Sequence, residues 1–375
     1  MNSRVLVAPD KFKGSAQAAQ VAAAIAAGIA RTRPAAEVVA LPMADGGEGT
    51  VAAALAAGFD SVSVSVSGPL RAPVQATYAR REEVAVIEMA AASGLIHSRA
   101  DIESARRASS FGTGELITDA LDSGARTIVL TLGGSACTDG GVGLLAALGG
   151  RFFDLGNDPL QRGGSALTGL GRVDLSGLDP RLADIELVLA SDVDNPLLGE
   201  HGAAAVYGPQ KGADPDTVAE LESGLGRLVE VLSGTRSQVR EIADQPGAGA
   251  AGGTGFAALL LGAKRRPGIE VLLELTGFRD QLTDVALVIT GEGSLDEQSL
   301  HGKVPMGVAA AAAERDIPTV VIAGVCSVPQ HRLREYGIVA AYALTDIEPD
   351  LQVCMNQAPR LLAEIAAAVA LARLS

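Results

Sequence analysis

Five short segments combine acidic side chains with glycine, hydroxyl or lysine residues in a way that suits phosphate chemistry. They read PDKFKGS (9–15), ADGGEGT (44–50), GGSACTDGGVG (133–143), SDVDNP (191–196) and TGEGSLD (290–296). A glycine turn between a strand and a helix exposes successive backbone N–H groups, and the helix dipole adds positive potential, so the turn attracts an anion. Carboxylates there would repel a bare phosphate unless Mg²⁺ or a substrate hydroxyl lay between. With lysines nearby, the segments predict phosphoryl transfer.

Lysine is scarce in this chain. Only five of the 30 basic residues are lysine: Lys11, Lys13, Lys211, Lys264 and Lys303. Where arginine is the usual cation, a lysine suits a site that needs a compact, flexible point charge. We interpret Lys13 and Lys211 as catalytic cations and Lys303 as a phosphate contact. The alternative is that they are ordinary surface lysines, as we expect for Lys264.

The acids of these turns are candidates for catalysis and metal binding. Asp45 is the first candidate to orient the substrate hydroxyl or hold a metal, the alternative being an Asp-Gly turn acid. Asp192 and Asp194 would point the same way on an extended strand end, as metal ligands often do, so we predict both as ligands and Asp192 also as catalytic. Glu292 and Asp296 could bind metal or nucleotide, or merely cap the following helix.

The other predicted site residues come from the same turns, from the segment IEMAAASGL (87–95) and from PGAGAAGG (246–253). The substrate-binding candidates are Asp10, Lys11, Gly46, Gly47, Glu48 and Ser93. The nucleotide- or phosphate-binding candidates are Gly133, Gly134, Ser135, Thr138, Gly249, Gly252, Gly253, Gly291, Gly293 and Lys303.

The elements that must position these residues alternate between strand and helix. Buried or half-exposed strands are predicted at 5–9, 37–43, 61–67, 84–90, 127–132, 186–190, 284–290, 319–323 and 338–344. Helices are predicted at 15–31, 50–57, 113–121, 214–232, 255–262, 304–315, 330–335 and 357–374. The charged segments follow strands, and in open α/β sheets ligands bind outside the carboxyl ends of the strands.

The rhythm of the elements predicts an α/β protein of two domains. Residues 1–65 and 284–375 are expected to form one discontinuous, Rossmann-like domain with a parallel sheet. Residues 66–283 are expected to form an inserted mixed α/β domain, with the active site in the cleft between the two. The length of 375 residues agrees with two domains.

Composition excludes several classes of protein. A net charge of −14 and an aromatic content of 3% argue against a nucleic-acid partner. Three isolated cysteines suit a reducing compartment, and neither a signal peptide nor a membrane-spanning segment is expected. We therefore expect a cytoplasmic protein without nucleic-acid or membrane partners, present as a monomer or a homodimer.

Other nucleotide-binding motifs are absent or incomplete. There is no GxxxxGK[ST], and the kinase motifs HRD and DFG are missing. A literal GxGxxG occurs at Gly247–Gly252, so a nucleotide-dependent oxidoreductase is an alternative of a different class. It would require a buried strand before Gly247, where the sequence reads DQP.

The strings taken together resemble the bacterial glycerate kinases of type 1. The similar segments are APDKFKGS, PMADGGEGT, IEMAAASGL, GTGELI, GGSACTDGGVG, SDVDNPLLG, GPQKGA, PGAGAAGG and ITGEGSLDEQSLHGKVPMGVA, in order along nearly the whole chain. The resemblance implies ATP-dependent phosphorylation of D-glycerate, most often at the 2-hydroxyl, with Mg²⁺ required by the chemistry. Formation of 3-phosphoglycerate, or action on another small hydroxy acid, is the alternative. Ser294 and Lys11 depart from the arginine and serine of enterobacterial relatives.

Overall fold

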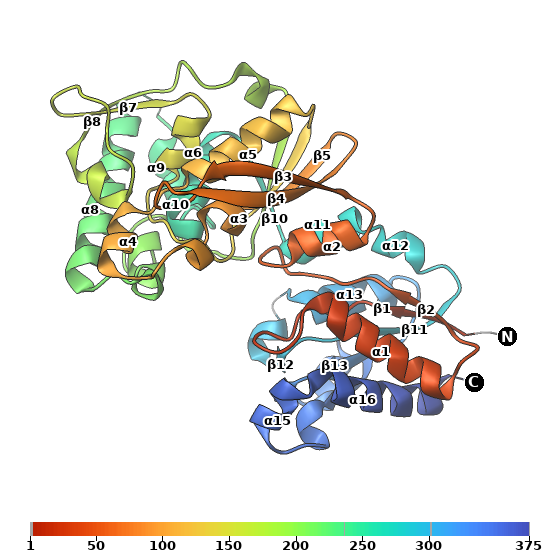
Figure 1. Cartoon of the computed structure of the whole chain (residues 1–375). Helices are drawn as coiled ribbons and strands as arrows, with labels where there is room; N and C mark the ends of the chain where they lie inside the picture. The colour runs from red at the N-terminus through yellow and green to blue at the C-terminus, as the bar shows by residue number, and fades with distance from the viewer. Residues whose placement is uncertain (1–2, 236, 301, 375) are drawn as a thin grey trace. The chain divides into compact units, whose positions relative to one another are not determined.

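The computed structural model describes residues 3–235, 237–300 and 302–374, so His301 of the last similar segment lies outside them. The chain divides into two compact units (Figure 1). Unit 1 comprises Met1–Gly58 and Pro267–Ser375, and unit 2 comprises Phe59–Arg266. Both chain ends therefore belong to one unit, and the middle of the chain forms the other.

Unit 1 is built on a five-stranded parallel sheet. Its strands are β1 (Arg4–Val7), β2 (Glu37–Ala40), β11 (Val285–Thr290), β13 (Thr319–Ala323) and β15 (Ile338–Ala343), in the spatial order β15-β13-β11-β1-β2. The chain leaves β1 toward β2 on one side and later returns to pair β11 with the other side of β1. The switch in winding direction therefore lies between β1 and β11, the place where doubly wound sheets bind ligands.

Helices cover both faces of this sheet because side chains alternate along each strand. Val5 and Val7 of β1 join one apolar cluster with α1 (Ala18–Thr32) and α16 (Ala358–Arg373), which lie side by side. Leu6 joins a second cluster with α11 (Gly268–Leu275), α12 (Phe278–Gln281) and α13 (Val304–Ala313). The remaining helices of unit 1 are α2 (Thr50–Ala56), α14 (Gln330–Arg334) and α15 (Leu351–Asn356).

Unit 2 is built on a six-stranded mixed sheet in the order β10-β9-β6-β5-β4-β3. The strands β3 (Asp60–Ser67) and β4 (Pro73–Arg81) are antiparallel, whereas β5 (Val84–Glu88), β6 (Thr127–Thr131), β9 (Glu186–Ala190) and β10 (Lys264–Arg266) run parallel. The longer helices are α5 (Phe111–Asp122), α8 (Pro215–Ser233) and α10 (Ala250–Leu260). Shorter elements are α3 (Ala90–Ser93), α4 (Ile102–Arg107), α6 (Val142–Ala147), α7 (Ala203–Tyr207), α9 (Val239–Ala243) and the hairpin β7 (Arg151–Asp154) and β8 (Leu170–Asp174).

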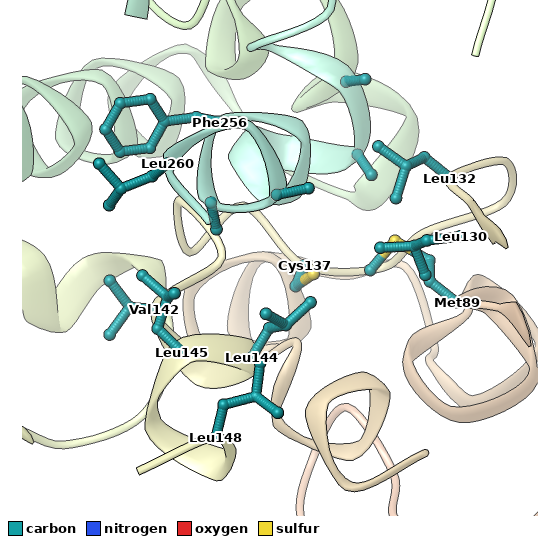
Figure 2. Close-up of a cluster of buried hydrophobic side chains, with 14 of the residues drawn as sticks. Met89, Leu130, Leu132, Cys137, Val142, Leu144, Leu145, Leu148, Phe256 and Leu260 are labelled. Atoms are coloured by element: carbon teal, nitrogen blue, oxygen red, sulfur yellow. The ribbon is translucent and has the colours of Figure 1, made fainter. Parts of the chain in front are cut away.

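One apolar core occupies the interior of unit 2. Figure 2 shows Cys137 among Leu130, Leu144 and Leu145, with Phe256 of α10 in the same cluster. Cys137 and Phe256 are fully buried. The turn 133–143 is therefore anchored by apolar packing, so its backbone has a fixed course.

The architecture confirms the predicted fold class, a parallel sheet from both chain ends plus an inserted mixed sheet. The strands at 186–190 and 319–323 have their predicted bounds. The unit boundaries fall at 58/59 and 266/267 rather than at the expected 65/66 and 283/284. The strand at 60–67 pairs with β4 of unit 2, and Ile269, Leu272 and Phe278 of α11 and α12 pack into the core of unit 1.

Candidate active site

Residues that follow the strands of the unit 1 sheet line one cavity of about 410 Å³. The charged ones come from the turns after β1, β2 and β11 and from the start of α13, and the switch between β1 and β11 lies among these turns. Seven predicted site residues meet there: Asp10, Lys11, Lys13, Asp45, Glu292, Gly293 and Lys303. A second hollow of about 300 Å³ shares Lys11 and Lys13 and reaches Gln17 and Gln20 at the start of α1. Carboxylates and ammonium groups from segments far apart in the chain are thus brought together.

Two carboxyl groups of this cavity have pKa values raised toward neutral pH. Burial, with the charge of Asp45 next in weight, raises the pKa of Asp10 to about 7. Burial also raises the pKa of Glu292 to about 7; a hydrogen bond with Ser299 and the charge of Lys303 oppose the effect, and the charges of Asp296 and Asp45 add to it. Asp10 accepts a hydrogen bond from the Lys11 backbone N–H at 2.6 Å. Perturbed carboxyl groups in a cavity are typical of functional sites.

Glu292 has an unsatisfied oxygen. Its side chain is only 5% exposed, and its Oε1 finds no hydrogen-bond partner within the described residues. A buried carboxylate oxygen without a partner is costly unless a ligand, a metal or water completes it. Asp296 behaves differently, because it accepts hydrogen bonds from the N–H groups of Gln298 (2.9 Å) and Ser299 (3.2 Å) and so caps the short helical turn 297–300.

The lysines of unit 1 have distinct surroundings. Lys11 joins the turns after β1 and β2, because its Nζ donates to the Glu48 carbonyl and lies 3.7 Å from the Glu48 carboxylate. Lys13 is exposed at the cavity, and Lys303 is the residue preceding α13. The exposed Lys13 and the half-buried Lys303 thus both line the cavity, as we expect of phosphate contacts.

The turn 44–50 owes its shape to glycine. Gly46 and Gly49 have φ of +83° and +103°, a region that side chains disfavour. The Thr50 hydroxyl donates to the Gly47 carbonyl at 2.8 Å at the start of α2. Asp45 is thus presented to the cavity by a turn that other residues would strain. Gly291 packs closely against the backbone of Ile322, which explains its lack of a side chain.

The other predicted residues lie in unit 2, and several of them follow the strands β5, β6 and β9. Ser93 follows β5, and its carbonyl accepts from the Ala136 N–H of the turn after β6 at 2.9 Å. Ser135 and Thr138 are buried in that turn. Gly134 accepts from the Leu95 N–H at 2.9 Å. Gly133–Gly143 is therefore tied to the segment 93–95, as expected of turns at one edge of a parallel sheet.

Lys211 is buried rather than exposed. It is 1% exposed, and its Nζ donates to the Cys137 carbonyl at 2.5 Å and lies 3.5 Å from the Thr138 hydroxyl. Burial lowers the pKa of its ammonium group, opposed by the charge of Asp139. Lys211 thus binds the backbone of the turn 133–143 and stabilises its conformation. The predicted contact of Lys211 with substrate stays a prediction.

The glycines at 249–253 pack against this turn. Gly252 and Gly253 have φ of +68° and +90°, and a Cβ on Gly253 would lie 2.7 Å from the Gly140 Cα. The Gly252 carbonyl accepts from the Gly140 N–H at 2.9 Å, and the Gly249 N–H donates to the Asn195 carbonyl at 2.9 Å. Close packing alone requires these glycines, so their proposed contact with nucleotide is not needed to explain them.

Asp192 and Asp194 follow β9 and are both exposed. The Asp194 carboxylate forms an ion pair with Arg265 at 2.5 Å. This guanidinium already occupies one oxygen of the predicted metal ligand. Within residues 3–235, 237–300 and 302–374, no three His, Cys, Asp or Glu side chains are arranged to hold a metal ion.

Comparison with known proteins decides the family. A model of the glycerate kinase family matches residues 5–374. The chain is 42% identical over 370 residues to a glycerate kinase of Halalkalibacterium halodurans, covering 98% of this chain and 97% of that one. It is also 42% identical over 345 residues to the glycerate 2-kinase of Escherichia coli K12, covering 91% and 90%. The chain belongs to the glycerate kinase family.

A solved structure supports the same assignment at the level of the fold. The crystal structure of a Salmonella typhimurium LT2 protein, classed provisionally as glycerate kinase 2, superposes with a TM-score of 0.84 at 40% identity. It covers 99% of this chain and 98% of that chain. As a glycerate kinase, the protein is a phosphotransferase. None of the helices described here is both long and apolar enough to cross a membrane.

The alternative of an oxidoreductase is wrong. Helix α9, not a strand, precedes Gly247, and Gly252 is used in packing against Gly140. In this glycerate kinase the GxGxxG string is therefore a structural segment of unit 2.

One residue with four hydrogen bonds escaped the sequence reasoning. Asp139 is 1% exposed and accepts from the Ser110 N–H (2.8 Å), the Ser110 hydroxyl (3.0 Å), the Gly141 N–H (3.1 Å) and the Gly143 N–H (3.2 Å). It lies within the motif CTDGGVG, so the sequence contained a signal, but nothing distinguished this acid from those that face a ligand.

Proposed function

We propose that this glycerate kinase transfers the γ-phosphoryl group of ATP to the 2-hydroxyl of D-glycerate and releases 2-phosphoglycerate and ADP. The observation that carries the proposal is the cavity of unit 1, where three lysines and three carboxyl groups meet beside the switch between β1 and β11. The Escherichia coli relative, a glycerate 2-kinase at 42% identity, favours the 2-hydroxyl over the 3-hydroxyl.

The residues of the cavity suit separate tasks. Asp45 orients the glycerate hydroxyl and accepts its proton as the oxygen bonds to the γ-phosphorus and the bond from that phosphorus to the β–γ bridging oxygen breaks. Lys13 and Lys303 bind the phosphates and stabilise the charge that gathers on the leaving ADP. Lys11 fixes the turn of Asp45 through its bond to Glu48.

The donor set fits Mg²⁺ bound together with the nucleotide. Mg²⁺ is commonly held by one or two carboxylates, waters and substrate phosphates rather than by a complete protein cage. The Glu292 carboxylate is of this kind, because its Oε1 has no hydrogen-bond partner within the described residues and Asp45 is near enough to perturb its pKa. When bound, the ion would neutralise charge on the transferring phosphoryl group. Glu292 is thus the protein ligand that we propose, in preference to Asp194 and Asp296.

A coupled assay with ATP, Mg²⁺ and D-glycerate, followed by ³¹P NMR of the product, tests the proposal. We expect ADP release that needs D-glycerate and is abolished by EDTA. The ³¹P spectrum of the product should show the resonance of 2-phosphoglycerate. The 3-phosphoglycerate resonance would contradict the choice of hydroxyl. ADP release that persists without any divalent ion would contradict the role given to Glu292.

A further inference from the structure

The cavity of unit 1 has walls of two chemical kinds. One part is formed by the charged groups already described. The other part, which we call the apolar wall, consists of Val325, Leu344, Leu351 and Met355. Val325 belongs to β14 (Val325–Cys326), Leu344 follows β15, and Leu351 and Met355 belong to α15. The apolar wall therefore comes from the short strand β14, the end of β15 and the helix α15 that follows.

Three of the four residues of the apolar wall are exposed, and Leu344 is the buried one. Five large apolar side chains are exposed in the described part of unit 1, namely Val325, Ile347, Leu351, Met355 and Leu371, and three of them line this cavity. Leu351 is 56% exposed and Met355 is 42% exposed. Exposed apolar side chains gathered in a hollow mark ligand-binding sites.

D-glycerate does not account for this wall. Each of its three carbons carries oxygen, so it offers no apolar face to Leu351 or Met355. A cavity of about 410 Å³ is of the size that takes a drug-sized ligand, for which roughly 300–1,000 Å³ is typical. A nucleotide combines the two chemistries that the walls present, an apolar base and an anionic chain of phosphates.

We propose that the apolar wall binds the base and ribose of ATP, with the phosphates directed to Lys13 and Lys303. The inference deepens the proposed function, on which it rests, by assigning the nucleotide to unit 1. The charges agree, since both ammonium groups line the same cavity as Leu351 and Met355. The glycine segments at 133–143 and 249–253 of unit 2 are then not required for base binding.

The apolar wall is connected to the turn that presents Lys13. The Ser15 hydroxyl donates to the Met355 carbonyl at 2.5 Å, which joins the turn after β1 to α15. The Asp350 carboxylate caps α15 by accepting from the N–H groups of Gln352 (2.8 Å) and Val353 (3.3 Å). A base on the apolar wall and phosphates at Lys13 would thus meet groups held in one frame, and the flexible Met355 side chain can adapt to a planar ring.

Two matched variants test the proposal. Leu351→Gln places a neutral polar side chain on the apolar wall, whereas Leu371→Gln changes a leucine of the same unit with almost the same exposure, 57%, outside the cavity. We expect Leu351→Gln to raise the KM for ATP and the Kd for ADP roughly tenfold, with kcat and the KM for D-glycerate unchanged. Interactions with the base are made equally before and in the transition state, so they affect KM. Leu371→Gln should match the parent.

Inorganic tripolyphosphate separates the base from the phosphates. Tripolyphosphate should compete with ATP, and its inhibition constant should be the same for Leu351→Gln as for the parent. For Lys13→Met the inhibition constant should be higher. Equal ADP affinity in Leu351→Gln and the parent, or an equal loss for ADP and tripolyphosphate, would overturn the assignment. Such a result, with phosphoglycerate still formed by the parent, would leave the proposed function intact. A parent that binds ADP through Leu351 but forms no phosphoglycerate would refute the function alone.

Discussion

At the scale of single residues, two carboxylates of the same turn in unit 1 have different surroundings. Glu292 and Asp296 belong to the same segment, yet one has a buried oxygen without a partner in the described residues and the other caps a helical turn. The sequence left both roles open for each acid. The difference arises from the surrounding strands, which no local pattern reports.

Asp45→Asn tests the proposed role of the acid in the turn 44–50, which leads into α2. Asparagine keeps the shape of the side chain and removes its charge, so we expect normal folding with a loss of roughly 10²- to 10⁴-fold in kcat, the range of a displaced acid–base group. The KM for ATP should move much less. Turnover and thermal melting are measured together, with the exposed Asp280→Asn of α12 as control. A residual rate that only follows a reduced folded fraction would make Asp45 a structural turn acid.

Lys211→Met separates the two interpretations of the buried lysine. Methionine fills a similar volume but leaves the Cys137 carbonyl without its donor and Asp139 without a nearby positive charge. We expect a loss of about 1–3 kcal/mol in the free energy of unfolding, measured by urea denaturation. Lys264→Met, which changes a lysine that is 72% exposed, is the control. Unchanged stability with a collapse of kcat would instead support direct contact of Lys211 with substrate.

At the scale of elements, the sequence predicted the parallel strands better than the pieces that flank them. Buried strands such as 186–190 and 319–323 are short apolar runs bounded by turn residues, and their burial on both faces keeps that signal clean. The strand β4 was missed because PVQATYARR mixes polar, charged and small residues on a strand that is exposed along part of its length. Helix α11 was missed as well, and that omission moved the expected unit boundary past it.

Several residues that the sequence analysis named lie together in the unit 1 cavity, and their roles in binding and catalysis stay predictions. The sequence identified Asp10, Lys13, Asp45, Glu292 and Lys303, which share one cavity. It could not tell that Lys211, equally close to glycines, is buried, since exposure depends on packing between segments distant in the chain. The apolar wall was also missed, because Leu351 and Met355 resemble core residues of an amphipathic helix until their exposure is known.

The packing of α10 against the turn 133–143 is tested by a pair of glycine variants. Gly253 and Gly262 both have φ of +90°, so alanine strains either backbone by about 1–2 kcal/mol. Only at Gly253 would the added Cβ also meet other atoms, the Gly140 Cα at 2.7 Å and Leu197 at 2.8 Å, whereas Gly262 has open space. We expect Gly253→Ala to lower the free energy of unfolding clearly more than Gly262→Ala, as measured in urea. Equal losses would mean that the segment relaxes without cost.

At the scale of the whole molecule, the cavity links stability to pH. Asp10 and Glu292 have pKa values of about 7 in the folded chain, against 3.8 and 4.5 as their ordinary values. Between those values the folded state binds more protons than the unfolded state, so the contribution of these groups to stability is complete below about pH 4 and is lost as the pH rises through 7. The ligand-free protein is therefore stabilised by these two groups at pH 5 and loses that stabilisation at pH 8.

Thermal melting of the ligand-free parent and of Glu292→Gln at pH 5 and pH 8 measures this linkage. Glutamine has no carboxyl group to ionise, so the variant avoids the cost of a buried charge at pH 8 and pays no comparable cost at pH 5, where Glu292 is protonated in the folded chain. We expect the variant to melt close to the parent at pH 5 and above it at pH 8. Glu335→Gln changes an exposed acid of the same unit and should leave the pH dependence of the parent intact. If Glu292→Gln kept the full pH dependence of the parent, Glu292 would be ionised in the ligand-free protein at both pH values. Its Oε1, which has no partner within the described residues, would then have to be satisfied by water.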